Sequence, residues 1–258
     1  MPKLLFIMLV FSVLSACMKK IDETLNWSAD KFYLEAHKSL VDGDYPGAIE
    51  YFEKLQGRFP YSKQARQADI EIIYAYYKYD ETDSALVSAN RFIDENPEHQ
   101  HLDYVYYLRA VTQYEKGSGT LYMLFPQDIA YLGFAHKQKS YDYFNQVVEL
   151  FPNSIYYQDS LLRVAYLKNK LAENELNIAK FYFDRQAYIA AINRCKEIIK
   201  NYPQTKAQIE ALIILDKSYL ALGYPDIAKQ YRNILATNNL QNYQVKIKPQ
   251  PLVDRIIH

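Results

Sequence analysis

The sequence predicts an all-α fold, a tetratricopeptide-repeat superhelical solenoid of about five helical hairpins. Its 258 residues include only 7 Gly and 10 Pro, too few for the many tight turns of an all-β protein. Hydrophobic residues make up 50% of the chain, with 26 Tyr and 12 Phe, so we expect a substantial core rather than disorder. A small residue also recurs at a fixed distance before a proline, which indicates internal repeats.

The first 17 residues read as an export signal. The apolar run Leu4–Leu14 is too short to cross a hydrocarbon core of ~30 Å as a helix, so it fits a signal peptide better than an anchor. It ends in Leu-Ser-Ala-Cys, Leu14–Cys17, which resembles the lipobox of bacterial lipoproteins. That resemblance implies cleavage after residue 16 and a covalent lipid on Cys17. The alternative is an ordinary signal with a chance cysteine.

The lipobox resemblance also bears on localisation and on the second cysteine. Met18 follows Cys17, and by the same resemblance this implies delivery to the periplasmic face of the outer membrane. We expect residues 17–29 to be a lipidated tether, 30–238 the repeat domain and 239–258 a flexible tail. With Cys17 lipidated, Cys195 has no disulfide partner, and its helical surroundings predict a small buried residue rather than a reactive thiol.

The repeats are predicted from the spacing of small residues and prolines. Five segments start at a small residue and end, twelve positions later, where a helix should stop: Ala48–Pro60, Ala85–Pro97, Ser140–Pro152, Ala191–Pro203 and Ala228–Leu240. The small residues let two helices approach closely, and proline disfavours helical geometry in the residue before it. The intervals between the small residues are 37, 55, 51 and 37, close to or longer than the period of ~34 typical of tetratricopeptide repeats.

Two stretches interrupt this period. Residues 117–133 contain Gly119 and Pro126 and the apolar run Leu121–Phe125, so we expect a loop inside the third hairpin that packs on the solenoid or on a partner. Residues 153–186 contain neither Gly nor Pro, which predicts one long helix or two abutting helices.

Catalytic and metal-binding motifs are missing from the sequence. It contains no HExxH, GxSxG, GxxxxGK[ST] or CxxC pattern, and His99 and His101 have no ligand spacing typical of a zinc site. Lys+Arg and Asp+Glu are both 30, so the chain lacks the basic excess of a bulk nucleic-acid binder. We therefore expect neither an enzyme nor a cofactor, apart from the lipid on Cys17.

A tyrosine-rich groove is the predicted binding surface. The first helix of each stacked hairpin lines the concave face, and tyrosine offers both apolar area and a hydroxyl. The residues expected there are Tyr33, His37, Ile70, Tyr74, Tyr77, Tyr104, Tyr107 and Tyr114. The alternative for each tyrosine is a place in the solenoid core. Lys78 and Arg109 either meet an acidic partner or belong to a solvated face, and we favour the solvated face.

Several stretches together resemble the BamD family, lipoproteins of the outer-membrane β-barrel assembly machinery. They are Gly43–Ile49, Arg58–Ser62, Ile73–Lys78, Arg91–Ile93, Asp103–Arg109, Phe151–Ser154, Tyr166–Leu176 and Ala190–Arg194. The resemblance covers about residues 17–238. One departure is Ala135–Lys139, where the family often carries Arg-Asp-Pro, so a loop-anchoring role of that motif is not carried over.

The resemblance implies a binding function with three kinds of partner. These are a BamA-like barrel protein contacted through its POTRA domain, other Bam lipoproteins, and the C-terminal segments of unfolded outer-membrane proteins. For the substrate segments we select Tyr33, Tyr74, Tyr77, Tyr104 and Tyr107, and for the BamA side Asn193, Arg194 and Glu197. Other readings are a lipoprotein of cell-wall binding or DNA uptake, and a hydrolase, for which no nucleophile–base pair is evident.

Overall fold

The computed structural model describes residues 23–116 and 126–237, and every helix or strand assigned within these ranges is an α-helix. The helices are α2 (Ala29–Val41), α3 (Tyr45–Arg58), α4 (Lys63–Lys78), α5 (Thr82–Glu95), α6 (Leu102–Lys116), α7 (Pro126–Leu150), α8 (Tyr157–Asp184), α9 (Tyr188–Asn201), α10 (Lys206–Ala221) and α11 (Pro225–Thr237). The chain divides between Ala68 and Asp69 into two compact units, here unit 1 and unit 2.

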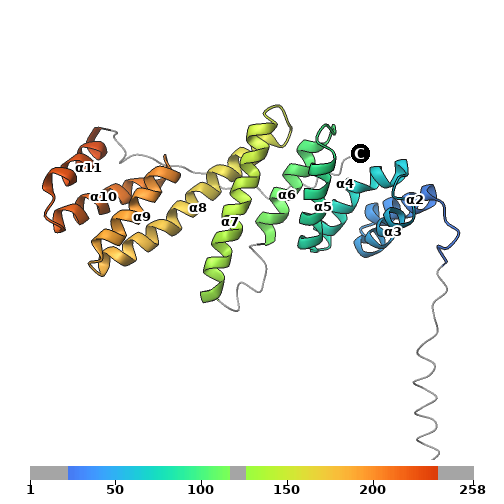
Figure 1. The fold of residues 1–258 in the computed structure, drawn as a ribbon, viewed down its shortest axis with the longest axis horizontal. Helices are drawn as coiled ribbons and strands as arrows, with labels where there is room; N and C mark the ends of the chain where they lie inside the picture. The colour runs from blue at the N-terminus through green and yellow to red at the C-terminus, as the bar shows by residue number, and fades with distance from the viewer. Residues whose placement is uncertain (1–22, 117–125, 238–258) are drawn as a thin grey trace, which may run out of the picture. The chain divides into compact units, whose positions relative to one another are not determined.

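Helices that follow one another in the chain pack side by side. In unit 1, α2 packs against α3. In unit 2, each helix from α5 to α11 packs against the next one (Figure 1). The long helix α8 contacts three helices: α7, α9 and α10. This arrangement confirms the predicted all-α tetratricopeptide-repeat fold.

The small residues that define the repeats lie at the tightest helix contacts. All five are almost completely buried: Ala48, Ala85, Ser140, Ala191 and Ala228. A side chain no larger than a methyl or hydroxymethyl group lets the facing helix approach closely, and aromatic and aliphatic side chains fill the space around it. Phe52 and Phe92 do so four and seven residues after the small residue of their own helices.

In the first four repeats, the second helix ends just before the predicted proline. The residues directly before three of these prolines adopt nearly the same backbone angles: φ is −132°, −132° and −127°, and ψ is 52°, 56° and 53°. They are Phe59 before Pro60, Asn96 before Pro97 and Tyr202 before Pro203. Because proline disfavours helical geometry in the residue before it, each helix stops at that residue.

A left-handed residue marks the turn of four of the hairpins. Gly43, Asp80, Gln186 and Gly223 have φ between 61° and 81°. Each lies five positions before its small residue, and two of them are not glycine. In the third hairpin the corresponding position, Ala135, lies inside α7.

The third hairpin differs from the expectation in one respect. Residues 117–133 were predicted to be a loop, but α7 begins at Pro126, so the prediction is wrong from that residue onward. Proline is well suited to the first helical position, where its missing N–H has no helical partner to lose. Residues 117–125, with most of the apolar stretch, lie outside the described residues.

The other open expectations are also settled. The interval 153–186 holds one helix of 28 residues, α8. Cys195 is completely buried, and burial raises the pKa of its thiol to about 12, as expected for a packing residue. Thr24 and Trp27, assigned to the tether, instead pack on the first hairpin of unit 1. Across residues 23–116 and 126–237, the helices are too short or too polar to cross a bilayer.

Candidate functional site

Four of the five tyrosines selected for peptide binding converge in unit 2. Tyr74 and Tyr77 lie one turn apart on α4, and Tyr104 and Tyr107 one turn apart on α6, so each pair shares a helix face. Tyr156, just before α8, joins them: its ring stacks on Tyr107 with centroids 4.6 Å apart and lies 5.6 Å from Tyr104. We call these five residues the tyrosine cluster.

Burial divides the tyrosine cluster in two. Tyr74 and Tyr104 are only 9% and 7% exposed, so these two side chains mainly pack within the unit, which was the alternative left open from the sequence. Burial, followed by the neighbouring tyrosines, raises the pKa of Tyr104. Tyr77, Tyr107 and Tyr156 are half-buried and keep part of their rings at the surface.

Two carboxylates fix the hydroxyl groups of the cluster. The Tyr77 hydroxyl donates to Glu115 Oε1 at 3.1 Å, and the Tyr107 hydroxyl donates to Asp159 Oδ2 at 2.9 Å. Burial and then the Asp159 charge raise the pKa of Tyr107, so the hydroxyl remains protonated and a donor. Burial raises the pKa of Glu115, although its bond with Tyr77 acts in the opposite direction.

A buried arginine lies beneath this layer. Arg163 is 3% exposed, and its Nε donates to the same Asp159 oxygen at 2.5 Å. Its guanidinium lies 5.5 Å from the ring centroids of both Tyr114 and Phe144. Its Nη2 is buried without a hydrogen-bond partner among the described residues. The positive charge is thus offset by one carboxylate and by aromatic faces.

Arg109 is not on a solvated face, as the sequence had suggested. It is 7% exposed, and its guanidinium lies between the rings of Tyr106 and Tyr143, at 4.7 and 4.1 Å from their centroids. It donates to Asn90 Oδ1 at 2.8 Å and to Gln146 Oε1 at 2.5 Å. Flat aromatic faces and amide oxygens suit a buried guanidinium, so Arg109 ties α5, α6 and α7 together.

Tyr33 belongs to unit 1 and is described separately. It is half-buried on α2, stacks on His37 with ring centroids 5.9 Å apart, and lies 6.5 Å from Phe52 of α3. It therefore contributes to an aromatic surface of the first hairpin.

The residues selected for the BamA side lie on α9. Asn193 and Glu197 are exposed and one turn apart, and the exposed Ile189 continues their row. The Arg194 side chain is 44% exposed, and its Nη1 donates to Glu175 Oε2 of α8 at 3.1 Å. We call Ile189, Asn193, Arg194 and Glu197 the α9 face.

The sequence analysis did not select Tyr156 or the charged residues that contact the tyrosine cluster. Tyr156 lies just before α8, and Asp159 and Arg163 lie in the first two turns of that helix. This part of the chain falls in an interval where the repeat spacing is irregular. Glu115 directly follows Tyr114, the last of the α6 tyrosines expected in the groove. A signal was available: Asp159, Arg163 and Tyr166 recur at helical spacing after Tyr156.

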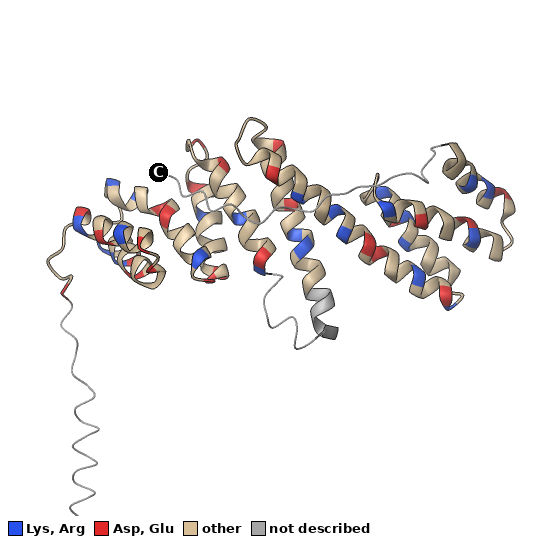
Figure 2. Ribbon diagram, turned by 180° about the vertical axis from the view of Figure 1, so that it is seen from behind, with Lys and Arg blue, Asp and Glu red and all other residues tan. Residues whose placement is uncertain are grey.

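Two further properties concern metal ligands and charge. Over residues 23–116 and 126–237 no group of three or more His, Cys, Asp or Glu residues is arranged to hold a metal. Figure 2 shows basic and acidic residues mixed along the drawn helices, with no stripe of one sign.

The sequence and structure were compared with known proteins. Among solved structures, the crystal structure of MamA protein aligns over 84% of this chain and 97% of its own, with 16% identity and a TM-score of 0.36, so the fold assignment depends on the repeat geometry above.

Sequence comparison identifies the family. The family model YfiO, described as outer membrane lipoprotein, matches residues 26–235. The outer membrane protein assembly factor BamD of Neisseria meningitidis serogroup A is 37% identical, over 92% of this chain and 91% of that protein. The protein of the same name from Vibrio cholerae is 34% identical, over 90% and 97%. The chain therefore belongs to the BamD family.

Proposed function

We propose that this protein is a lipid-anchored, non-enzymatic subunit of the machinery that assembles β-barrel proteins in the outer membrane. In this role it holds a BamA-like barrel protein through that protein's POTRA domain, contacts other Bam lipoproteins, and receives unfolded outer-membrane proteins. The observation that carries the proposal is membership of the BamD family over nearly the whole repeat domain. The lipid on Cys17, outside the described residues, is part of the proposal.

The tyrosine cluster supports the receiving role. The rings of Tyr77, Tyr107 and Tyr156 are partly exposed and held in place by stacking and by Glu115 and Asp159. A rigid aromatic surface binds an aromatic side chain at low entropic cost. We therefore assign to it the aromatic residue at the end of a substrate's C-terminal segment, with Tyr74 and Tyr104 as its packed support.

The α9 face supports the scaffolding role. The Arg194 side chain is 44% exposed while bound to Glu175, so part of its guanidinium remains open to solvent. The planar guanidinium has five donors and holds a carboxylate with two of them. We propose that Arg194 bridges Glu175 and an acidic residue of the BamA-like partner, and that Asn193 and Glu197 border this contact.

Affinity purification tests the function as a whole. The full chain, tagged at its C-terminus, is purified from detergent-solubilised membranes, and mass spectrometry identifies the proteins that accompany it. The proposal expects a near-stoichiometric barrel protein with POTRA domains that remains bound at high salt. Recovery of cell-wall or DNA-uptake proteins without such a barrel protein would show that the function is different.

A peptide-binding experiment tests the cluster. Fluorescence anisotropy measures the affinity of a labelled peptide with a C-terminal Phe for the full chain and for Tyr77→Ala. Loss of one aromatic contact of ~1 kcal/mol predicts about fivefold weaker binding. The matched control is Tyr224→Ala, because Tyr224 is a 55% exposed tyrosine outside the cluster. Equal affinity of the two variants would remove the cluster from the proposal.

A further inference from the structure

The residues before α2 fold back onto the first hairpin of unit 1. The Trp27 ring lies 5.2 Å from Phe32 and 5.4 Å from Tyr51, and Lys31 Nζ lies 4.5 Å from the Trp27 centroid. Thr24 is 6% exposed, and its carbonyl accepts a hydrogen bond from Arg58 Nη1 at 2.6 Å. The folded domain therefore includes Thr24 and Trp27, which lie several residues before the start that the helix pattern predicts.

A second contact brings the start of α4 to the same end of unit 1. Gln64 Nε2 donates to Asp30 at the start of α2. Tyr61 thus lies in a short connection between Arg58 and Gln64, both of which are bonded to the segment 24–30. We call this region, which displays Leu25 and Tyr61, the anchor end of unit 1. Leu25 is 67% exposed and Tyr61 92% exposed.

The distance from Cys17 limits where the anchor end can be. Only six residue steps separate Cys17 from Glu23, which corresponds to at most about 20 Å of extended chain. A lipidated cysteine sits at the edge of the hydrocarbon core, and the headgroup layer uses about 5–7 Å of that reach. Glu23 is thus confined to within roughly 15 Å of the membrane surface. The anchor end lies beside it, because Arg58 is hydrogen-bonded to Thr24.

We propose that the anchor end of unit 1 rests against the lipid headgroups of the membrane that holds Cys17, with Leu25 and Tyr61 as its contact residues. The inference rests on the lipid anchor in the proposed function. Tyrosine is favoured at the headgroup level because its ring is apolar and its hydroxyl polar. Lys19 and Lys20 of the tether add attraction to anionic lipids.

Site-specific fluorescence tests this contact on the lipidated full chain. Tyr61→Cys introduces a reactive thiol, since Cys195 is buried with a raised pKa and lipidated Cys17 has no thiol. An environment-sensitive dye on residue 61 is compared in detergent-free vesicles of phosphatidylethanolamine and phosphatidylglycerol and in detergent micelles without phospholipid. We expect a blue-shifted, brighter emission in the vesicles.

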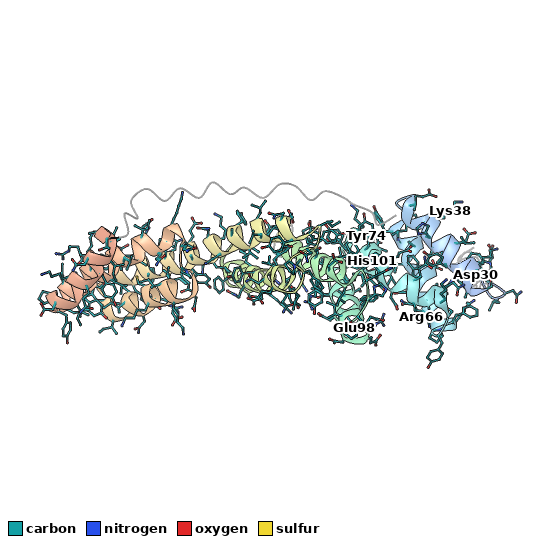
Figure 3. The ribbon with its side chains drawn as sticks, turned by 90° about the horizontal axis from the view of Figure 1, so that it is seen from above. Asp30, Lys38, Arg66, Tyr74, Glu98 and His101 are labelled. Atoms are coloured by element: carbon teal, nitrogen blue, oxygen red, sulfur yellow. The ribbon has the colours of Figure 1, made fainter. Side chains whose placement is uncertain are left out.

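The matched control is Val41→Cys with the same dye. Val41 is also exposed, at 56%, but lies at the opposite end of α2, about 18 Å along the helix from Ala29. Figure 3 labels Asp30 and Lys38, which mark the two ends of this helix. The dye on residue 41 is expected to emit as in water in both samples, and circular dichroism checks that both variants are folded.

Vesicle flotation separates the possible outcomes. Flotation with a blue shift at residue 61 alone supports the proposal. Flotation with equal emission at residues 61 and 41 would overturn it while leaving the lipid anchor intact. A chain that does not float lacks the anchor, and both the membrane contact and the proposed localisation would then be wrong.

Discussion

The tyrosine cluster and the α9 face are both candidate binding surfaces of unit 2, but they are built differently. In the cluster, the rings proposed to bind also pack: Tyr107 stacks on Tyr156, faces the fully buried Phe144 and donates to Asp159. On the α9 face, Asn193 and Glu197 are exposed, and the 44% exposed side chain of Arg194 forms an ion pair with Glu175. Binding and stability are therefore coupled in the cluster and nearly independent on the α9 face.

This difference determines how each surface is to be tested. A substitution in the cluster lowers stability as well as affinity, so the affinity of Tyr77→Ala is compared beside its urea-unfolding midpoint. A substitution on the α9 face reports on the partner directly. The following predictions examine this difference, starting with the largest change in the free energy of unfolding.

Phe144→Ala is expected to have the largest effect. Phe144 is completely buried between Tyr107 and Arg163, and removing a buried phenyl ring costs about 3–5 kcal/mol. Urea unfolding followed by circular dichroism measures the change. Leu150→Ala is the control on the same helix, because Leu150 is 56% exposed. Similar losses in both variants would show that the cluster has no packed core beneath it.

Asp159→Ala is expected to destabilise the protein by about 2 kcal/mol. The substitution removes the carboxylate that pairs with the buried Arg163 charge, so only aromatic faces remain beside that charge. Because the Asp159 side chain is 34% exposed, water already screens part of the ion pair, and the lost stability is smaller than for a fully buried pair. The same urea measurement applies. Glu173→Ala, which breaks the exposed pair with Lys170 on the same helix, should cost less than ~1 kcal/mol. An Asp159→Ala variant as stable as this control would contradict the role given to Arg163.

Exchanging the charges of Arg194 and Glu175 tests the α9 face. Arg194→Glu should lower stability by less than ~1 kcal/mol, because the pair is partly exposed, yet it should sharply reduce recovery of the BamA-like partner. Adding Glu175→Arg restores an internal ion pair. Recovery should stay low in the double variant. A return to normal recovery would mean that partner binding requires the internal ion pair and not a contact from Arg194 to the partner.

Glu115→Gln should have the smallest effect, visible as a change in pH dependence. The folded-state pKa of Glu115 is raised above its ordinary value of 4.5, so its stabilising contribution is present below that pH and is lost as pH rises through the raised pKa. The stability of the unsubstituted protein relative to Glu115→Gln should therefore fall as pH rises above the ordinary pKa of 4.5. Urea midpoints at several pH values check this, and a relative stability that rises with pH would contradict it.

The repeat framework was predictable because it depends on local rules. A buried small residue such as Ala191 and a proline such as Pro203 act within one helix, and their spacing is visible in the sequence. The start of α7 was not predictable in this way, since Pro126 suits both a loop and a first helical turn.

The candidate site was only partly predictable, since it depends on contacts between distant residues. Tyr74 and Tyr77 share a face of one helix, and Tyr104 and Tyr107 share a face of another, in any helical reading. Periodicity does not say which of these rings are covered. Tyr104 is covered because Tyr156, 52 residues further along the chain, packs on it. Arg109 was misjudged for a similar reason: its partners Asn90 and Gln146 come from two other helices.

The left-handed turn residues have a consequence for the spacing of the repeats. In four hairpins the left-handed residue lies five positions before the small residue of the same hairpin. These hairpins form two neighbouring pairs, and within each pair the small residues are 37 positions apart. The irregular intervals of 55 and 51 residues flank Ser140, whose hairpin has no turn at that offset. The turn geometry therefore fixes the phase of each regular 37-residue module, whereas around Ser140, inside α7, no left-handed turn at that offset sets the length of the connection.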